Sequence, residues 1–232
     1  MPDLGSPTLE KISRMKNFNR WMYERIAPYI GERILEVGAG IGNLTQFFID
    51  REFVLASDVE DSYLSALRDK FGARENFKTL KLDFMDDVKP VVKPHKIDTI
   101  VCLNVLEHIL EDRAALRNMY EILIPGGNLI ILVPAFQWLY GTMDKNLLHH
   151  RRYSKKELRE KFETAGFNVI HTEWMNIAGI PGWFINGKIR KVDALPEKQL
   201  ALYDKLVPIF RIFEKLTGPP IGQSIIMVGR KG

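Results

Sequence analysis

Ile34-Leu35-Glu36-Val37-Gly38-Ala39-Gly40-Ile41-Gly42-Asn43-Leu44-Thr45 is the stretch of this 232-residue sequence that decides the fold. Its apolar start predicts a buried strand, three glycines follow at alternate positions, and Asn43 is placed to cap a helix over residues 43–50. Glycines let the backbone approach a ligand closely, and a helix start offers unpaired N–H groups. The order of strand, turn and helix therefore predicts a cradle for a nucleoside-like ligand.

The spacing of the glycines narrows the kind of ligand. They follow a G-x-G-x-G pattern, whereas the dinucleotide fingerprint is G-x-G-x-x-G. Glu36 adds a carboxylate at the end of the strand, where it would repel a pyrophosphate. A cationic or neutral ligand suits this position better.

Further predicted strands, with the polar residues that follow them, come after the glycine turn along the chain. Residues 53–57 predict a second strand that ends at Asp58, 16 residues beyond Gly42. The later segments are three: Leu80-Lys81-Leu82-Asp83-Phe84; the apolar run 97–103, which continues into Asn104-Val105-Leu106-Glu107-His108; and Leu123-Ile124-Pro125-Gly126-Gly127-Asn128-Leu129-Ile130-Ile131.

Together these five segments, over residues 30–135, resemble the motifs of the class I S-adenosylmethionine-dependent methyltransferases, and 104–108 is similar to the N-V-L-E-H signature of small-molecule members. The resemblance implies an α/β fold with a doubly wound, mostly parallel, seven-stranded Rossmann-like sheet and helices on both faces. It also implies that the last strand inserts antiparallel beside the fifth.

The resemblance implies S-adenosyl-L-methionine as the cofactor and assigns residues to it. Asp58 would accept the ribose hydroxyls, Asp83 would receive the adenine amino group, and Phe84 or Met85 would flank the ring. The full predicted set is Glu36, Gly38, Ala39, Gly40, Gly42, Asp58, Val59, Asp83, Phe84, Met85, Asn104 and Val105.

Hydrophobic periodicity predicts alternating strands and helices, which is typical of a parallel sheet with its ligand at the carboxyl ends of the strands. Ser154 and Glu157 form a capping box, Gly166 ends the helix that it opens, and Pro208 predicts a kink. Strands are predicted at 33–37, 53–57, 77–81, 97–103, 128–133, from 167 and at 224–229, and helices at 8–29, 43–50, 61–71, 111–123, 154–165 and 197–216.

The chain length suits a single domain over residues 1–232. We expect an N-terminal helical arm at 1–30, a cofactor-binding half at 31–133, and a substrate-side half at 134–232. Segments 134–153 and 175–199 are expected to act as lids in that second half.

A second group of polar residues lies at 149–153. It resembles a pattern in bacterial members of the family, D-x-x-x-x-H-x-R-R-Y, which begins here at Asp144. His149 and His150 could supply a general base near neutral pH, and Arg151 and Arg152 could bind an anionic substrate group. The alternative is a basic segment before a helix.

Several aromatic residues raise the same choice between substrate contact and core packing. Trp21 and Tyr23 lie in the N-terminal helical region, and Trp183 lies in the second lid segment, so all three are candidate substrate contacts. Packing is the default for an aromatic residue at helical spacing. Tyr153 is expected to be structural.

Composition limits the class of partner. The net charge of +4 and the single cysteine, Cys102, favour a reducing, cytoplasmic setting without a disulfide, and they do not favour nucleic acid. The sequence shows neither a signal-peptide pattern nor a run of about 20 apolar residues, so no transmembrane segment is expected, although loose contact with an anionic membrane surface fits the charge. No cluster has metal-ligand spacing, which predicts no metal. The oligomeric state is open.

These observations favour transfer of a methyl group by in-line displacement to a small-molecule, lipid or glycan-precursor acceptor. The accepting atom (O, N, C or S) stays open. Three alternatives also remain: an RNA or protein methyltransferase, a nucleotide-cofactor oxidoreductase on a similar sheet, and a non-catalytic module that binds the cofactor. The glycine spacing and Glu36 argue against the oxidoreductase.

Overall fold

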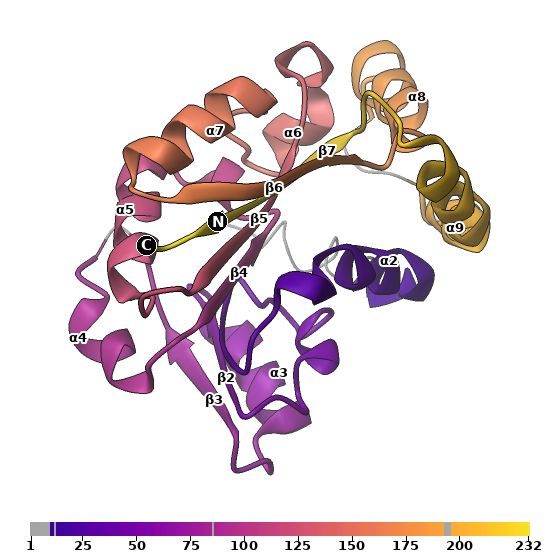
Figure 1. Ribbon diagram of the computed structural model, residues 1–232. Coiled ribbons are helices and arrows are strands. Elements are labelled where there is room, and N and C mark those ends of the chain that lie inside the picture. Colours follow the sequence, from indigo (N-terminus) through magenta and orange to yellow (C-terminus); the bar gives the residue numbers. More distant parts are fainter. Residues whose placement is uncertain (1–9, 12, 85, 193–195) are drawn as a thin grey trace.

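The computed structural model describes residues 10–11, 13–84, 86–192 and 196–232, which form a seven-stranded sheet with helices on both faces (Figure 1). The strands are β1 (Arg33–Val37), β2 (Phe53–Asp58), β3 (Phe77–Lys81), β4 (Thr99–Leu103), β5 (Asn128–Pro134), β6 (Asn168–Met175) and β7 (Ser224–Arg230). Their order in the sheet is β3-β2-β1-β4-β5-β7-β6. Strands β1 to β5 are parallel, and β7 runs antiparallel to both β5 and β6. The predicted fold class is confirmed.

The helices cover the two faces of the sheet in separate groups. They are α2 (Lys16–Ile26), α3 (Asp61–Phe71), α4 (Lys89–Val92), α5 (Asp112–Ile122), α6 (Thr142–Asn146), α7 (Lys155–Thr164), α8 (Gly179–Phe184) and α9 (Glu197–Thr217). Figure 1 shows α4, α5 and α7 on one face, and α2, α3 and α9 on the other. Short 3-10 turns are η1 (Ala27–Tyr29), η2 (Thr45–Phe47), η3 (Lys93–His95), η4 (Leu106–His108) and η5 (Gln137–Leu139), and η6 (Ile185–Ile189) is a π-helical turn.

Several predicted boundaries are correct and others are wrong. The ranges of α3 and β3 match the prediction, and the Ser154 hydroxyl caps α7 by accepting the Glu157 N–H at 3.1 Å. The predicted helix 43–50 is instead the 3-10 turn η2, because the Thr45 hydroxyl bonds Glu36 and both Phe48 and Ile49 pack into the core. Of the predicted helix 8–29, the part from residue 16 to residue 29 forms α2 and η1. Its first two residues fall outside the described ranges. Helix α9 continues through Pro208.

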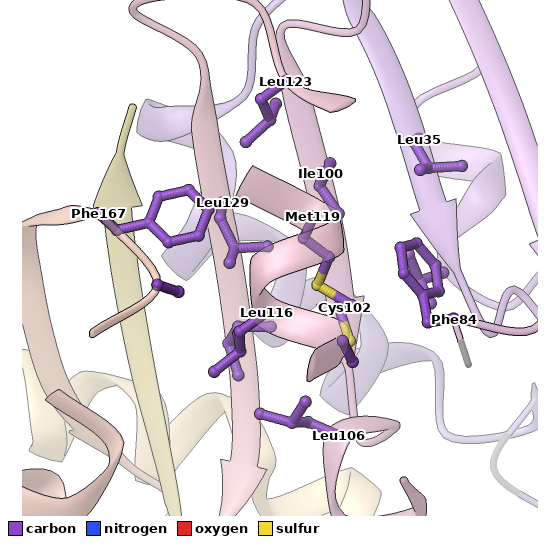
Figure 2. Packing of buried hydrophobic residues seen from close by; sticks show 14 of the residues in the cluster. Leu35, Phe84, Ile100, Cys102, Leu106, Leu116, Met119, Leu123, Leu129 and Phe167 are labelled. Atoms are coloured by element: carbon purple, nitrogen blue, oxygen red, sulfur yellow. The ribbon is translucent and has the colours of Figure 1, made fainter. Parts of the chain in front are cut away.

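Apolar residues alternate along each central strand and so build two cores. Leu35, Ile100 and Leu129 face α5 and α7, whereas their neighbours Ile34 and Val101 face α2, α3 and α9. Figure 2 shows the first core, in which Leu116 and Met119 of α5 lie against the strands. Central parallel strands must be apolar on both sides, which explains why their sequences are almost continuous apolar runs.

We expect Leu116→Ala to lower the free energy of unfolding by about 2–5 kcal/mol, because it leaves a cavity beneath α5 in a core where Leu116 is fully buried. The matched control is Leu110→Ala. Leu110 is 62% exposed, and its loss should change stability by less than about 0.5 kcal/mol. Urea denaturation measures both, and equal effects of the two changes would contradict the packing described for α5.

Candidate functional site

The glycine loop between β1 and η2 has a backbone that requires glycine. Gly38, Gly40 and Gly42 have φ values of +67°, +54° and +82°. A Cβ on Gly38 would lie 2.4 Å from Cγ2 of Val105, and one on Gly42 would lie 2.7 Å from the Phe71 ring. The first glycine therefore lets the loop approach the segment after β4, and the third lets it approach α3.

Asp58 ends β2 directly beside this loop. Its Oδ2 accepts the Gly40 N–H at 2.8 Å, and its Oδ1 accepts the Glu60 N–H at 3.1 Å. A carboxylate can accept about four hydrogen bonds, so two of its lone-pair positions are left for a ligand. The side chain thus holds the loop in place and has capacity to bind hydroxyl groups.

A cavity of about 120 Å³ lies at the carboxyl ends of β1 and β4. The glycine loop forms one wall, and α2 contributes Asn19 and Met22 to another. Among the predicted cofactor residues, the ones that line it are Glu36, Gly38, Ala39 and Asn104. Ligand pockets are usually larger than about 300 Å³, so this cavity is smaller than a typical ligand site.

Glu36 is the acidic group of the cavity. It is 4% exposed, and its carboxylate accepts the Thr45 hydroxyl at 2.6 Å. Burial raises the pKa of Glu36 to about 8, against the lowering effect of Thr45 and with a further rise from Asp58. A buried carboxyl with one neutral partner favours a bound cation, since a cation would stabilise its ionised form.

The residues predicted around adenine do not all lie at this edge. Asp83 and Val59 are exposed beyond the ends of β3 and β2. Phe84, predicted as one of two residues to flank the ring, has a side chain that is 2% exposed and lies in the core (Figure 2). Leu82 and Phe84 are buried, whereas Asp83 between them is exposed. Met85 lies outside the described residues.

The segment after β4 links the cavity to a second group of residues. Asn104 has a φ of +55° and donates its N–H to Leu132 at 2.8 Å, and Val105 packs on Gly38. The turn η4 follows at once and contains Glu107 and His108.

We call Glu107, Asp144, His149, Arg152 and Trp183 the polar cluster. Asp144 lies at its centre: Oδ1 accepts Arg152 Nε at 2.8 Å and lies 3.0 Å from His149 Nδ1, while Oδ2 accepts Trp183 Nε1 at 3.1 Å. Burial alone would raise the pKa of Asp144, but the bonds from His149, Arg152 and the backbone hold it below its usual range. The ionised carboxylate therefore orients His149 with Nε2 turned away from it.

Glu107 faces that imidazole. Its side chain is fully buried, its Oε1 lies 4.0 Å from His149 Nε2, and neither carboxylate oxygen has a hydrogen-bond partner among the described residues. Burial raises the pKa of Glu107 to about 8, with Asp144 raising it further and Arg152 lowering it. His108 packs edge-on to His149 at 4.7 Å between ring centroids. Burial, then His149 and His150, lower the pKa of His108 to about 4.

Donor atoms of Glu107, His108 and His149 lie within 4.8 Å of one another, a grouping that the sequence spacing did not predict. Ligands on a tetrahedral metal are closer, at about 3.4 Å. The Arg152 guanidinium next to Asp144 also places a positive charge beside these atoms. We therefore assign no metal to the polar cluster.

The structure separates the predicted substrate and catalytic residues. His149 and Trp183 meet in the polar cluster, while His150 is exposed and donates its N–H to the Glu107 carbonyl at 2.8 Å. Arg151 pairs with Asp112 at 2.9 Å.

Two substrate predictions do not fit their positions. Arg152 is 2% exposed and bonds Asp144 and the Ala135 carbonyl, so it holds the cluster rather than a substrate. Trp21 is 1% exposed and packs in the second core, because α2 turns it toward the sheet. Tyr23 is half-buried and stacks on Phe47 at 4.9 Å.

Sequence reasoning did not assign a role to Glu107 or Asp144. A signal was present for Asp144, since it begins the D-x-x-x-x-H pattern that ends at His149. Helix α6 and the following turn bring these two residues together, with the His149 N–H bonded to the Asp144 carbonyl at 2.9 Å. Nothing in the pattern showed that the Glu107 side chain is buried.

The chain is similar to known proteins both in sequence and in fold. A sequence profile of the methyltransferase domain family matches residues 13–172. The chain is 31% identical over 116 residues to the ubiquinone/menaquinone biosynthesis C-methyltransferase UbiE of Vibrio campbellii, a match that covers 44% of this chain and 41% of that protein. It is 29% identical over 143 residues to a polyketide synthase of Dictyostelium discoideum, which covers 51% of this chain and 6% of the synthase. The chain thus spans less than half the length of these relatives.

Solved structures share the fold at low sequence identity. A SAM-dependent methyltransferase from Archaeoglobus fulgidus superposes with a TM-score of 0.64 at 15% identity, over 93% of this chain and 94% of that one. An S-adenosylmethionine-dependent methyltransferase from Mesorhizobium loti gives 0.62 at 14% identity, over 91% and 98%.

The raised pKa of Glu107 predicts a pH dependence of stability. The folded protein keeps this proton up to about pH 8, whereas an unfolded chain releases it near pH 4.5. The free energy of unfolding should therefore fall between these pH values, by on the order of 5 kcal/mol from this group, and change no further above them. Glu107→Gln should remove that part of the fall, measured by urea denaturation across the pH range.

The exposed Glu111 offers a matched control. Glu111→Gln should leave the pH profile as in the unaltered protein. An unchanged profile for Glu107→Gln as well would show that Glu107 is ionised in the folded state.

Proposed function

The chain belongs to the methyltransferase domain family, and from this premise we propose that it uses S-adenosyl-L-methionine to methylate a small-molecule, lipid or glycan-precursor acceptor. The observation that supports this most is the glycine loop held by Asp58 beside a cavity at the carboxyl ends of β1 and β4. Parallel α/β sheets bind their ligands at this edge.

The residues of this edge fit the cofactor. When bound, S-adenosyl-L-methionine supplies an activated methyl group on a positively charged sulfur. Asp58 would accept the ribose hydroxyls with the lone pairs that Gly40 and Glu60 leave free. Glu36 would lie beside the cationic amino-acid portion, which would restore its ionised form. Asp83 would receive the adenine amino group, without Phe84 at the ring.

The cavity is too narrow for the whole cofactor, so we propose that the N-terminal arm opens it. Helix α2 forms its outer wall through Asn19 and Met22. The helix is attached to α9, whose Asp204 accepts the Phe18 N–H at 2.9 Å. Residues 1–30 would then act as the arm, 31–133 as the cofactor half and 134–232 as the substrate half, with lids at 134–153 and 175–199.

The polar cluster would serve the acceptor. Asp144 fixes the imidazole of His149 through Nδ1 and leaves Nε2 to take a proton from an acceptor hydroxyl. The segment 104–108 connects this imidazole to the cofactor cavity within a few residues. UbiE is named a C-methyltransferase, and an acidic C–H or O–H group is the kind of acceptor that needs such a base. The remaining chain would align the acceptor and exclude water.

Binding of S-adenosylhomocysteine tests the cofactor assignment. We expect Asp58→Ala to weaken binding by about 1–3 kcal/mol, because it removes a charged hydrogen-bond acceptor. Isothermal titration calorimetry measures this. Asp61→Ala is the matched control, since Asp61 is an exposed carboxylate three residues away that pairs with Lys81, and its affinity should not change. Equal affinities for all three proteins would refute the ribose assignment.

Substitution of His149 tests the base. For a hydroxyl or carbon acceptor found by screening phenols, sugars and activated methylenes, His149→Gln should lower kcat by about 10²–10⁴-fold and leave S-adenosylhomocysteine affinity unchanged. His150→Gln, at the exposed neighbour, should keep most of the activity. A fully active His149→Gln enzyme would remove His149 from the mechanism without affecting the cofactor assignment.

A further inference from the structure

Helix α9 carries an apolar side that no described part of the chain covers. Five of its large apolar residues are 53–81% exposed. They recur at helical spacing and therefore share one side of the helix. These residues are Leu202, Ile209, Ile212, Phe213 and Leu216.

Exposed apolar residues also lie on the neighbouring α8 and η6. Phe184, Ile185 and Ile189 are exposed there, and Figure 1 shows α8 next to α9. The Asn186 amide donates to the Gln199 amide oxygen at 3.0 Å, which joins η6 to the start of α9. We call these exposed residues of α8, η6 and α9 the apolar surface. Contiguous exposed patches of this kind mark interaction sites.

Most charges around the apolar surface are positive. Residues 179–192, all described, contain Lys188, Arg190 and Lys191, all exposed, and no acid. On α9 the exposed charged residues are Glu197 at its first position and Lys198, Lys205 and Lys215, and Arg211 is half-buried.

The two acids of α9 that follow Glu197 are turned inward. Asp204 is 9% exposed and accepts the backbone N–H of Phe18, whereas Glu214 is 1% exposed and accepts the Ile177 N–H at 2.7 Å. The outer side of the helix therefore shows apolar groups and cations. This is the pattern of helices that lie in the interface of an anionic membrane.

We propose that the apolar surface binds the face of an anionic lipid bilayer, with α9 lying in the plane of the interface. Its aliphatic and aromatic side chains would enter the headgroup region, and its lysines would contact lipid phosphates. A second copy of the chain is a poorer occupant, because its cations would face those of the first. Among the helices of the described ranges, none has the length and apolar character of a membrane span.

This proposal goes beyond methyl transfer and does not depend on it. The surface does adjoin the polar cluster: Trp183 of α8 donates to Asp144, and its ring lies 4.8 Å from the Arg152 guanidinium carbon. A chain bound to a bilayer would thus hold this wall of the candidate site near the lipid.

Vesicle flotation tests the proposal with the full chain. One set of vesicles contains equal parts of phosphatidylcholine and phosphatidylglycerol, and the other contains phosphatidylcholine alone. We expect the protein to float with the anionic vesicles, less with the neutral ones, and less in high salt. Ile209→Ser with Leu216→Ser should lower the partition coefficient by about tenfold. Lys198→Gln with Lys205→Gln should lower it for anionic vesicles alone.

The control removes comparable exposed apolar groups elsewhere. Val91 and Leu110 are 49% and 62% exposed near α4 and α5, on the other face of the sheet, and Val91→Ser with Leu110→Ser should float as the unaltered protein does. Circular dichroism and thermal unfolding verify that each variant folds. Absence of flotation, or equal flotation of the Ile209→Ser, Leu216→Ser variant, would overturn the proposal. Light scattering could instead show that the unaltered protein is a dimer, that the Ile209→Ser, Leu216→Ser variant is a monomer, and that neither binds vesicles. That result would overturn the proposal in favour of a second copy of the chain.

Discussion

The close contact between the glycine loop and the segment after β4 is the constraint on which the rest of the site depends. Gly38 lies against Val105 with no room for a Cβ, so the carboxyl ends of β1 and β4 meet at one point. Asp58 fixes the same loop from the other side through Gly40. Two residues beyond Val105 the chain reaches Glu107, and the cavity and the polar cluster are thereby built on one short segment.

Most of the sheet could be predicted from the sequence, and the reason is physical. Central parallel strands are buried on both faces, so β1, β2, β4 and β5 are short apolar runs that local patterns reveal. The turn η2 could not be predicted in this way. Its helical signal was overridden when Thr45 bonded the buried Glu36 and Phe48 entered the second core. Likewise Phe84 followed the direction of its backbone into the first core.

The site was predicted less completely because its polar groups come from distant segments. Asp58 and the glycines lie where sequence order places them, at strand ends. Glu107 and Asp144 are 37 residues apart and meet through α6, a five-residue helix without a hydrophobic pattern. Residues within the basic segment 149–152 also differ in burial: Arg152 is buried as a partner of Asp144, whereas His150 is exposed. Sequence spacing cannot distinguish these neighbours, because burial is decided by the packing of other elements.

Helix α9 is attached to the rest of the chain by polar contacts on its inner side and has an apolar outer side. Its contacts with α2 and with residues 176–177 are made by Asp204 and Glu214, and Arg211 pairs with Glu24. Because polar bonds anchor the inner side, few of its apolar residues are needed for the core, and Val207 is the one buried large aliphatic residue among those described in the helix. Tyr203 and Phe210 pack partly buried against the second core, whereas the exposed aliphatic and aromatic side chains contribute little to the fold. Exposed apolar side chains lower solubility, and a large patch of them on a protein surface marks an interaction site.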